Sequence, residues 1–391
     1  MAGSTWGTLF RATTWGESHG KGIGVVVDGC PAGLSLCEED IQSYLDRRKP
    51  GQSKFTTMRR EGDRVEILSG VFEGKTTGTP ISMLVRNEDQ RSHDYSEIMD
   101  VYRPGHGDYP FEEKYGFRDY RGGGRSSGRE TIGRVAAGAV AARFLESLEI
   151  YVKAYTRSIG GITVSPERFD MEEAAKNRLC MPDAQAAKQA AAWLEERMAE
   201  CDSAGGVVEC IVEGMPVGIG EPVFDKLDAS LAKAVMSIGA VKGVEIGDGF
   251  YAAESSGSDN NDEFYIGSAG NVEKRTNHAG GILGGMSDGS PVILRAAFKP
   301  TPSIASRQHT VNRKGEETEL VIKGRHDPIV VVRAVVVVEA MTALTVADLL
   351  LASMSSRLDL IQKFFSMERD TKRDIKRDIM RDRETQGDAE S

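Results

Sequence analysis

The sequence is poor in cysteine and has no long uninterrupted apolar run. Its 391 residues include five cysteines and no Cys-x-x-Cys pair, which argues against a structural zinc site or a disulfide framework and fits a reducing compartment. No His-Glu-x-x-His motif occurs, so no metal is expected. The first twenty residues lack the basic and apolar stretches of a secretory signal. Arg333 and Glu339 interrupt the most apolar segment, residues 329–341, so no membrane span is expected. We expect a cytoplasmic protein.

Basic side chains are fewer than acidic ones. The chain has 59 acidic and 49 basic side chains and a formal net charge of -10, which argues against general nucleic-acid binding. A single Arg-Gly-Gly tripeptide and an aromatic content of 7% are poor support for an RNA-binding module. No Gly-x-Gly-x-x-Gly motif follows an expected strand, so a nicotinamide-binding Rossmann unit is not expected.

The hydrophobic pattern favours an α+β protein. The expected strands are grouped along the sequence, with long apolar helices between the groups. This order does not match the regular alternation of strand and helix in a doubly wound sheet. We expect strands at 23–29, 65–68, 80–86, 206–214 and 290–298. We expect helices after a Ser35/Glu38 capping box to about Arg48, and at 129–148, 184–200 and 227–238, with residues 335–354 changing from strand to helix near Glu339.

No Pro/Ser-rich linker divides the chain. We therefore expect one domain over residues 1–357 and a charged tail over residues 358–391. In the tail, Arg-Asp pairs recur every four residues from Arg369 to Asp382, which fits a solvated, helical or disordered segment, with a partner contact as the alternative.

Glycine is abundant, and it is concentrated. Of 44 glycines, 19 lie within residues 16–33, 105–128 and 270–289. Glycine serves where the backbone needs positive φ or where a ligand approaches closely. His19, His106 and His278 lie in the same three segments. A histidine in such a loop either acts in proton transfer or is an ordinary polar turn residue.

The second glycine-rich segment predicts an anion site. Gly122–Gly124 precede the long helix at 129–148, and Ser127 and Glu130 have capping-box spacing. A glycine-rich turn that enters a helix presents free N–H groups and the positive end of the helix dipole. Neighbouring arginines add positive charge: Arg121, Arg125, Arg129 and Arg134. A surface helix with exposed arginines would explain these cations but leave the glycines unexplained.

Further basic groups lie elsewhere. Residues 47–60 contain six Lys/Arg and no acid, so this segment is either a solvated loop or one that closes over an anionic ligand. Lys299 and Arg325 lie at expected strand ends, where small-molecule sites are common. Asp327 is expected to be ionised and to pair with an arginine. These residues together predict a ligand with several negative charges.

The chain resembles the chorismate synthases. The resemblance covers about Trp6 to Leu350, in motifs that include FRATTWGESHG, DRRKPGQSKFTTMRRE, DQRSHDY, RPGHGDYPFEEKYGFRDYRGGGRSSGRET, TNHAGGILGG, KPTPSI and GRHDPIVVVRAV. It implies a β-α-β sandwich of antiparallel sheets around long central helices. It also implies a lyase that converts 5-enolpyruvylshikimate 3-phosphate to chorismate and phosphate by trans-1,4-elimination, with reduced FMN as cofactor. The alternative is an inactive homologue that binds flavin or anions.

The resemblance also implies roles for residues. His19, with Ser18 beside it, would protonate the leaving phosphate; His106 would protonate or hydrogen-bond the flavin; Asp327 would assist proton removal through flavin N5. Ser127 joins this catalytic set. Expected substrate contacts are Arg48, Arg103, Arg129 and Arg134, while Arg48 and Lys54 would bind NADP or substrate. Expected FMN contacts are Arg125, Ser126, Ser127, Gly239, Ala240, Gly284, Lys299, Pro300, Thr301, Pro302, Ser303 and Arg325.

The resemblance finally implies a homotetramer. Some chorismate synthases reduce their own flavin with NADPH, generally with extra insertions. No insertion or second nucleotide fold is evident here, so a separate flavin reductase is expected. Gly239 stands where asparagine is usual, and its flavin contact is therefore expected from the backbone alone.

Overall fold

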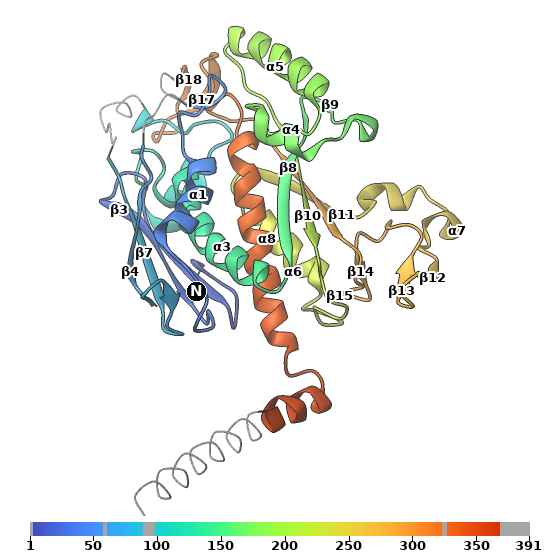
Figure 1. Ribbon diagram of the computed structural model, residues 1–391. Helices are drawn as coiled ribbons and strands as arrows, with labels where there is room; N and C mark the ends of the chain where they lie inside the picture. The colour runs from blue at the N-terminus through green and yellow to red at the C-terminus, as the bar shows by residue number, and fades with distance from the viewer. Residues whose placement is uncertain (1–2, 58–60, 89–97, 323–326, 368–391) are drawn as a thin grey trace, which may run out of the picture.

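Two antiparallel five-stranded sheets enclose a layer of helices (Figure 1). The computed structural model describes residues 3–57, 61–88, 98–322 and 327–367. The first sheet has the order β1 (Thr5–Trp6), β2 (Arg11–Gly16), β3 (Gly22–Asp28), β7 (Ile81–Arg86) and β4 (Val65–Ser69). The second has the order β11 (Val241–Ile246), β16 (Val292–Phe298), β10 (Gly206–Glu213), β8 (Tyr151–Ile159) and β9 (Ile162–Thr163).

Four helices fill the space between the sheets. They are α1 (Glu38–Arg48), α3 (Thr131–Glu146), α6 (Leu227–Met236) and α8 (Val331–Ser353). Helices α1 and α3 pack on the first sheet, α6 and α8 pack on the second, and α3 contacts α8 in the middle. A Cβ at Gly138 of α3 would lie 2.2 Å from the Cβ of Ala340 in α8, so the absence of a side chain permits this close packing. The expected α+β sandwich is confirmed.

Smaller elements cover the sandwich. The remaining helices are α2 (Asp108–Tyr115), α4 (Met171–Lys176), α5 (Ala184–Ala199) and α7 (Gly257–Asn260). Two-stranded ladders join β5 (Val71–Phe72) to β6 (Lys75–Thr76), β12 (Phe264–Ile266) to β13 (Val272–Lys274), β14 (Ile282–Leu283) to β15 (Met286–Ser287), and β17 (Gln308–Val311) to β18 (Glu317–Leu320). Short 3-10 turns are η2 (Gly124–Ser126), η3 (Gly128–Glu130), η4 (Pro166–Arg168) and η5 (Gly249–Ala253).

The core is continuous through both sheets. One cluster of buried apolar side chains extends from Phe10, just before β2, to Ala347 in α8. This continuity supports the proposal of a single domain over residues 1–357. Residues 358–367 are helical, and the rest of the expected tail lies outside the described residues.

The expected strand within residues 335–338 is wrong. These valines belong to α8, which is helical from Val331 onward. Val335–Val338 are buried, and burial against α3 and the second sheet outweighs the slightly lower helix propensity of valine. Helix α8 is long and apolar enough to cross a membrane, but 78% of its most apolar window is buried inside the protein, as in the core helix of a globular domain.

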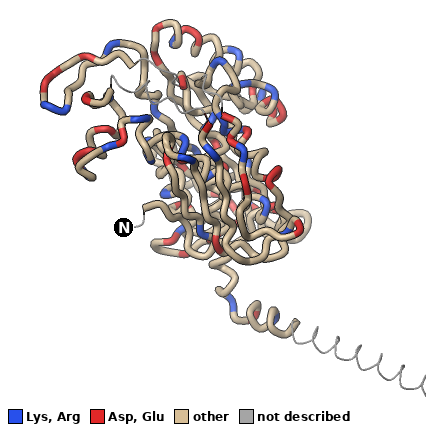
Figure 2. Tube along the Cα trace, turned by 90° about the vertical axis from the view of Figure 1, so that its left-hand side faces the viewer, with Lys and Arg blue, Asp and Glu red and all other residues tan. Residues whose placement is uncertain are grey.

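The start of α1 also differs from the expectation. Cys37, rather than Ser35, is the N-cap, and its backbone N–H donates to the Asp40 carboxylate at 2.9 Å. The remaining expected helices and strands are found within a few residues of their predicted ends. Figure 2 shows acidic and basic positions mixed along the trace, so the net acidity is spread over the protein.

Candidate active site

Loops from both halves of the sandwich surround a cavity of about 1280 Å³. The loop after β2, the end of α1 and the segment from Arg103 to Arg134 contribute from one side. Residues 237–240 and 298–303 and the start of α8 contribute from the other. Pockets for one drug-sized ligand measure about 300–1,000 Å³, so this cavity can hold more than one small molecule.

A glycine loop brings two histidines together at the cavity. Gly122 and Gly123 have φ of +72° and +82°, a region that glycine adopts without steric cost. A Cβ at Gly122 would lie 2.9 Å from both His19 Nε2 and Ser18 Oγ. A Cβ at Gly123 would lie 3.0 Å from His106 Cε1 and 2.9 Å from Ser126 Oγ. The two histidines therefore contact consecutive residues of one loop, with no room for side chains there.

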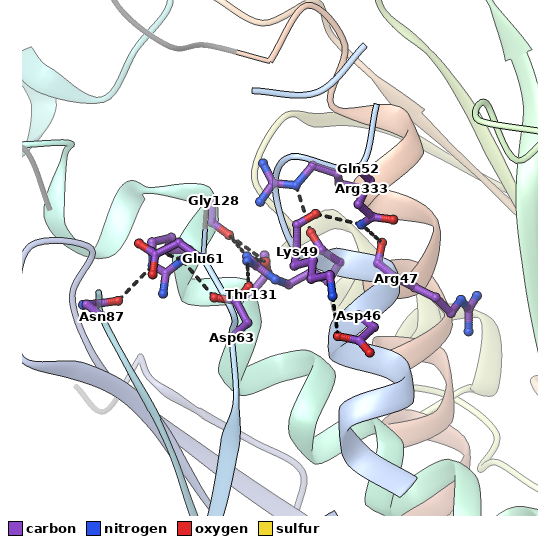
Figure 3. Close-up of polar contacts among 12 residues, drawn as sticks. Asp46, Arg47, Lys49, Gln52, Glu61, Asp63, Asn87, Gly128, Thr131 and Arg333 are labelled. Atoms are coloured by element: carbon purple, nitrogen blue, oxygen red, sulfur yellow. Dashed lines mark hydrogen bonds and ion pairs between the residues drawn. The ribbon is translucent and has the colours of Figure 1, made fainter. Parts of the chain in front are cut away.

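Arg48 and Arg129 share one buried carboxylate, that of Asp63, which is labelled in Figure 3. Asp63 Oδ2 accepts from Arg48 Nη2 at 2.5 Å, and Asp63 Oδ1 accepts from Arg129 Nη1 at 3.1 Å. The Asp63 side chain is fully buried, and the two arginine side chains are 1% and 5% exposed. Both arginines nevertheless line the cavity, so an anion in the cavity meets two oriented cations.

The charges of this group shift each other's pKa values. Burial lowers the pKa of Arg48 to about 10, with Arg333 and Arg129 acting in the same direction and Asp63 against it. Arg48 thus stays protonated at neutral pH. Burial alone would raise the pKa of Asp63, but Arg48 and Arg129 hold it below its ordinary value.

His106 belongs to a second buried pair. Asp108 accepts hydrogen bonds from Arg103 Nε and Nη2, both at 2.7 Å, and its Oδ1 lies 3.0 Å from His106 Nδ1. Burial opposes the charge on Asp108, yet Arg103 and His106 hold the pKa of this carboxyl far below its usual range. Arg103 Nη2 also lies 3.0 Å from His106 Nδ1, so Arg103 and Asp108 together fix the orientation of the imidazole through this nitrogen.

Asp327 and Arg134 have partners of their own. Asp327 accepts from Arg333 Nη1 at 2.6 Å and from the Thr57 backbone N–H at 2.8 Å. Arg134 pairs with Glu130 at 2.9 Å and donates to Ser237 Oγ at 2.6 Å. The expected pairing of Asp327 with an arginine is therefore found, although the partner is Arg333 of α8.

Two other cations of the cavity lining have no carboxylate partner within the described part of the chain. Arg125 donates to the Gly16 carbonyl at 3.1 Å and to Thr14 Oγ1 at 2.7 Å. Lys299 donates to the Gly105 carbonyl at 2.6 Å. Nearby, the buried Thr301 Oγ1 has no hydrogen-bond partner among the described residues. A cation without a carboxylate partner, such as Lys299 near the unsatisfied Thr301 hydroxyl or Arg125 elsewhere in the lining, suits the binding of a phosphate.

Comparisons with known proteins decide the family. The model of the family described as chorismate synthase matches residues 10–351. The chain belongs to the chorismate synthase family. It is 66% identical to a chorismate synthase from Agathobacter rectalis, over 93% of this chain and 99% of that protein. It is 53% identical to one from Cytophaga hutchinsonii, over 91% of this chain and 99% of that protein.

A solved structure agrees with the sequence relatives. The structure titled "Crystal Structure of Chorismate Synthase" has a TM-score of 0.71 and 32% sequence identity, and covers 93% of this chain and 98% of that chain. The resemblance inferred from the motifs is confirmed, as is the lyase class of enzyme. Chorismate synthase function is supported over the inactive homologue.

The cavity collects most of the residues singled out in the sequence. Those that line it are His19, His106, Asp327, Ser127, Arg48, Arg103, Arg129, Arg134, Arg125, Ser126, Gly239, Ala240, Lys299, Thr301, Pro302 and Ser303. Ser18 is buried beside the cavity, next to Gly122. The ligand contacts expected of these residues stay predictions.

Besides Ser18, three described residues singled out in the sequence as catalytic or binding residues do not line the cavity. Lys54 forms an ion pair with Glu195 on the exposed surface, at 2.5 Å. Gly284 and Pro300 are not among the cavity residues, and Gly284 lies in the turn between β14 and β15. Arg325 lies outside the described residues. The third glycine-rich segment, 270–289, supplies no described lining residue, and His278 in it bonds to the Asn260 carbonyl at 3.1 Å.

The basic segment 47–60 is largely neutralised in its described part. Arg47 pairs with Glu339, Lys49 with Asp46, Lys54 with Glu195 and Arg48 with Asp63. Of these four cations, Arg48 alone lines the cavity. Both interpretations of this segment stay predictions. Arg48, Pro50 and Thr57 line the cavity, whereas Arg47, Lys49 and Lys54 each pair with an acidic side chain.

Several residues of the site were not predicted from the sequence. Asp63, Asp108 and Arg333 each bond a residue that was singled out, and Arg333 lines the cavity. Asp108 could have been predicted from the sequence, because Arg103, His106 and Asp108 lie close together in one motif. Asp63 and Arg333 have partners distant in the sequence, and no local pattern marks them. Within the described residues, no cluster of three His, Cys, Asp or Glu suits a metal ion.

Proposed function

We propose that this chain binds 5-enolpyruvylshikimate 3-phosphate and reduced FMN together in the cavity, and eliminates phosphate from the first to give chorismate. The observation that carries the proposal is the cavity itself, which combines two histidines that contact one glycine loop with six arginines among its described lining residues. A substrate with one phosphate and two carboxylates needs such a set of cations. The volume of about 1280 Å³ supports two ligands rather than one.

The substrate's anionic groups would bind the paired arginines. Arg48 and Arg129 are fixed by Asp63, Arg103 by Asp108 and Arg134 by Glu130. Because these guanidinium groups are already oriented, little conformational entropy is lost when the substrate binds.

The residues around Arg125 and Lys299 fit the flavin. Arg125, Lys299, Ser126 and the hydroxyl of Thr301 would hold its phosphate and ring edges, with Gly239 and Ala240 contributing backbone groups. Reduced FMN, when bound, would supply electron density that helps the substrate's phosphate to leave.

The chain's own side chains would move the protons. His19 lies in the lining beside Gly122 and Ser18 and would protonate the departing phosphate as a general acid. His106, oriented by Asp108 at 3.0 Å, would donate through Nε2 toward the cavity. Asp327, held by Arg333 and Thr57, would take up the proton released from the substrate ring.

The assembly and supply of cofactor are further parts of the proposal. The homotetramer is proposed from the resemblance to the chorismate synthases. A separate reductase would deliver reduced FMN, NADP would be its product rather than a ligand of this chain, and the enzyme would work in the cytoplasm.

An anaerobic assay tests the proposal. The purified chain is mixed with 5-enolpyruvylshikimate 3-phosphate and chemically reduced FMN, and chorismate and phosphate are followed. We expect both products in equal amounts with reduced FMN and none with oxidised FMN. Absence of turnover with reduced FMN refutes the activity, and equal turnover with oxidised FMN refutes the cofactor.

A further inference from the structure

Asp63 lies directly behind two cavity arginines. Its side chain is fully buried and is not part of the cavity lining. One oxygen bonds Arg48 at the end of α1, and the other bonds Arg129 in η3, just before α3. Asp63 therefore joins two elements that are far apart in the sequence, and it can affect a ligand only through these arginines.

The backbone at Asp63 is strained. Its φ is +46°, a left-handed conformation that non-glycine residues seldom adopt. Hydrogen bonds hold the segment in place: Gln42 Nε2 donates to the Asp63 carbonyl at 3.3 Å, and Gln42 Oε1 accepts from the Val65 N–H at 3.1 Å. Strain of this kind persists where surrounding contacts fix the conformation, and it is enriched at functional sites.

Further contacts fix the two guanidinium groups. Arg129 Nε donates to Asn87 Oδ1 at 2.9 Å. Arg48 Nη1 donates to the Gly128 carbonyl at 3.3 Å and to Thr131 Oγ1 at 3.4 Å. Arg48 Nε is buried and has no hydrogen-bond partner in the described part of the chain. A buried donor without a partner beside a cavity is suited to an incoming acceptor.

A second carboxylate lies near the two arginines. Glu61 Oε1 is 3.6 Å from Arg129 Nη1, and the Glu61 side chain is fully buried. The arginines alone would repel each other in a buried setting, and Asp63, which bonds both of them, keeps the two cations close together.

We propose that Asp63 is a positioning residue, which fixes Arg48 and Arg129 in the relative geometry that binds the anionic groups of the substrate. This inference rests on the proposed function of the cavity. It predicts that a substitution of Asp63 raises KM for the substrate more than it lowers kcat. An interaction that is equally strong in the ground state and the transition state affects KM and leaves kcat unchanged.

The test is Asp63→Asn. Asparagine has the same shape and tolerates the left-handed conformation. It offers one acceptor in place of two, and its NH2 group faces the other guanidinium, so one arginine loses its orientation. We expect KM for 5-enolpyruvylshikimate 3-phosphate to rise about tenfold to hundredfold, as for one lost charge-assisted contact, with kcat within about threefold of the parent.

A matched control separates an effect on the position of the two arginines from a general loss of stability. Asp183 is a fully buried carboxylate that pairs with Arg168 at 2.9 Å, and it does not line the cavity. Asp183→Asn should lower the melting temperature and leave KM unchanged. Asp63→Glu is a second variant that keeps the charge but displaces the carboxylate by one methylene, and we expect a raised KM there too.

A parental KM in folded Asp63→Asn or folded Asp63→Glu overturns the inference. If Asp63→Asn does not fold, Asp63→Glu decides alone. The proposed function fails in a different way, by lack of turnover in the parent chain. If the parent chain turns over the substrate and the Asp63 variants keep the parental KM, only the positioning role is refuted.

Discussion

The cavity lining holds positive charge in two ways, and the two groups of cations are named the paired side and the open side after their contacts, whichever elements carry them. On the paired side, Arg48 and Arg129 share Asp63, Arg103 is bound by Asp108 and Arg134 by Glu130. On the open side, Arg125 and Lys299 are held by carbonyl and hydroxyl oxygens and have no carboxylate partner among the residues described.

The difference has physical consequences. A buried carboxylate offsets the cost of burying an arginine and fixes its geometry, so the paired side suits a substrate that must be held in one orientation. An uncompensated cation near solvent attracts anions more strongly but is screened by salt. We therefore expect substitutions on the paired side to affect both stability and substrate binding, and those on the open side to affect flavin affinity.

The largest effect on rate is expected from His106→Ala. Removal of the imidazole leaves the Arg103–Asp108 pair intact, so substrate KM should stay within a few-fold while kcat falls about 100-fold or more. Steady-state kinetics with reduced FMN measure both. His278→Ala, a histidine outside the cavity, is the control and should behave as the parent. A kcat within a few-fold of the parent would show that His106 has no role in proton transfer.

The next largest effect is expected from the loss of the Arg48 side chain. Arg48→Ala leaves Asp63 with a single arginine, and breaking a buried pair costs about 3–5 kcal/mol of unfolding free energy. KM for the substrate should rise about tenfold or more, since a charge-assisted contact is lost. Urea unfolding and steady-state kinetics measure the two effects.

Arg47 provides the control for Arg48. It is adjacent in α1 and pairs with Glu339 at 2.7 Å, away from the cavity lining. Arg47→Ala should lower stability and leave KM unaltered. An equal rise in KM in both variants would mean that Arg48 acts through the fold alone.

On the open side, the effect should be smaller and confined to the flavin. Arg125→Ala should weaken FMN binding about tenfold and reduce its salt dependence, because one charge-assisted contact is lost. The free energy of unfolding should change by about 1 kcal/mol or less, since no buried carboxylate is stranded. Fluorescence titration of FMN at two salt concentrations measures this. An unchanged affinity would remove Arg125 from the flavin site.

The smallest effect is a pH dependence of stability on the paired side. The pKa of Asp108 is lowered in the folded protein, after the opposing effect of burial. Its contribution to stability is therefore present above the unfolded pKa of about 4 and is lost as pH falls toward the folded value. Between pH 7 and pH 3, the parent should lose about 1 kcal/mol more than Asp108→Asn. Equal losses in urea unfolding would contradict the pairing.

The sequence predicted the glycine loop and the long helices well, because both depend on local signals. Gly122–Gly124 and the helix after them follow from backbone freedom and apolar content. The start of α8 was not predictable, because Val335–Val338 have strand-like side chains and only their burial makes the helix favourable. Asp63 and Arg333 were missed because their partners lie far along the chain, and carboxylates behind arginines leave no periodic pattern.

The difference between the two sides is tested most directly by crossed titration. 5-Enolpyruvylshikimate 3-phosphate and FMN are each titrated calorimetrically into the parent, Arg48→Ala and Arg125→Ala. We predict that Arg48→Ala loses about tenfold or more in substrate affinity and keeps its FMN affinity, and that Arg125→Ala does the reverse. If both variants weaken both ligands by the same factor, the cavity does not have separate sides for substrate and flavin.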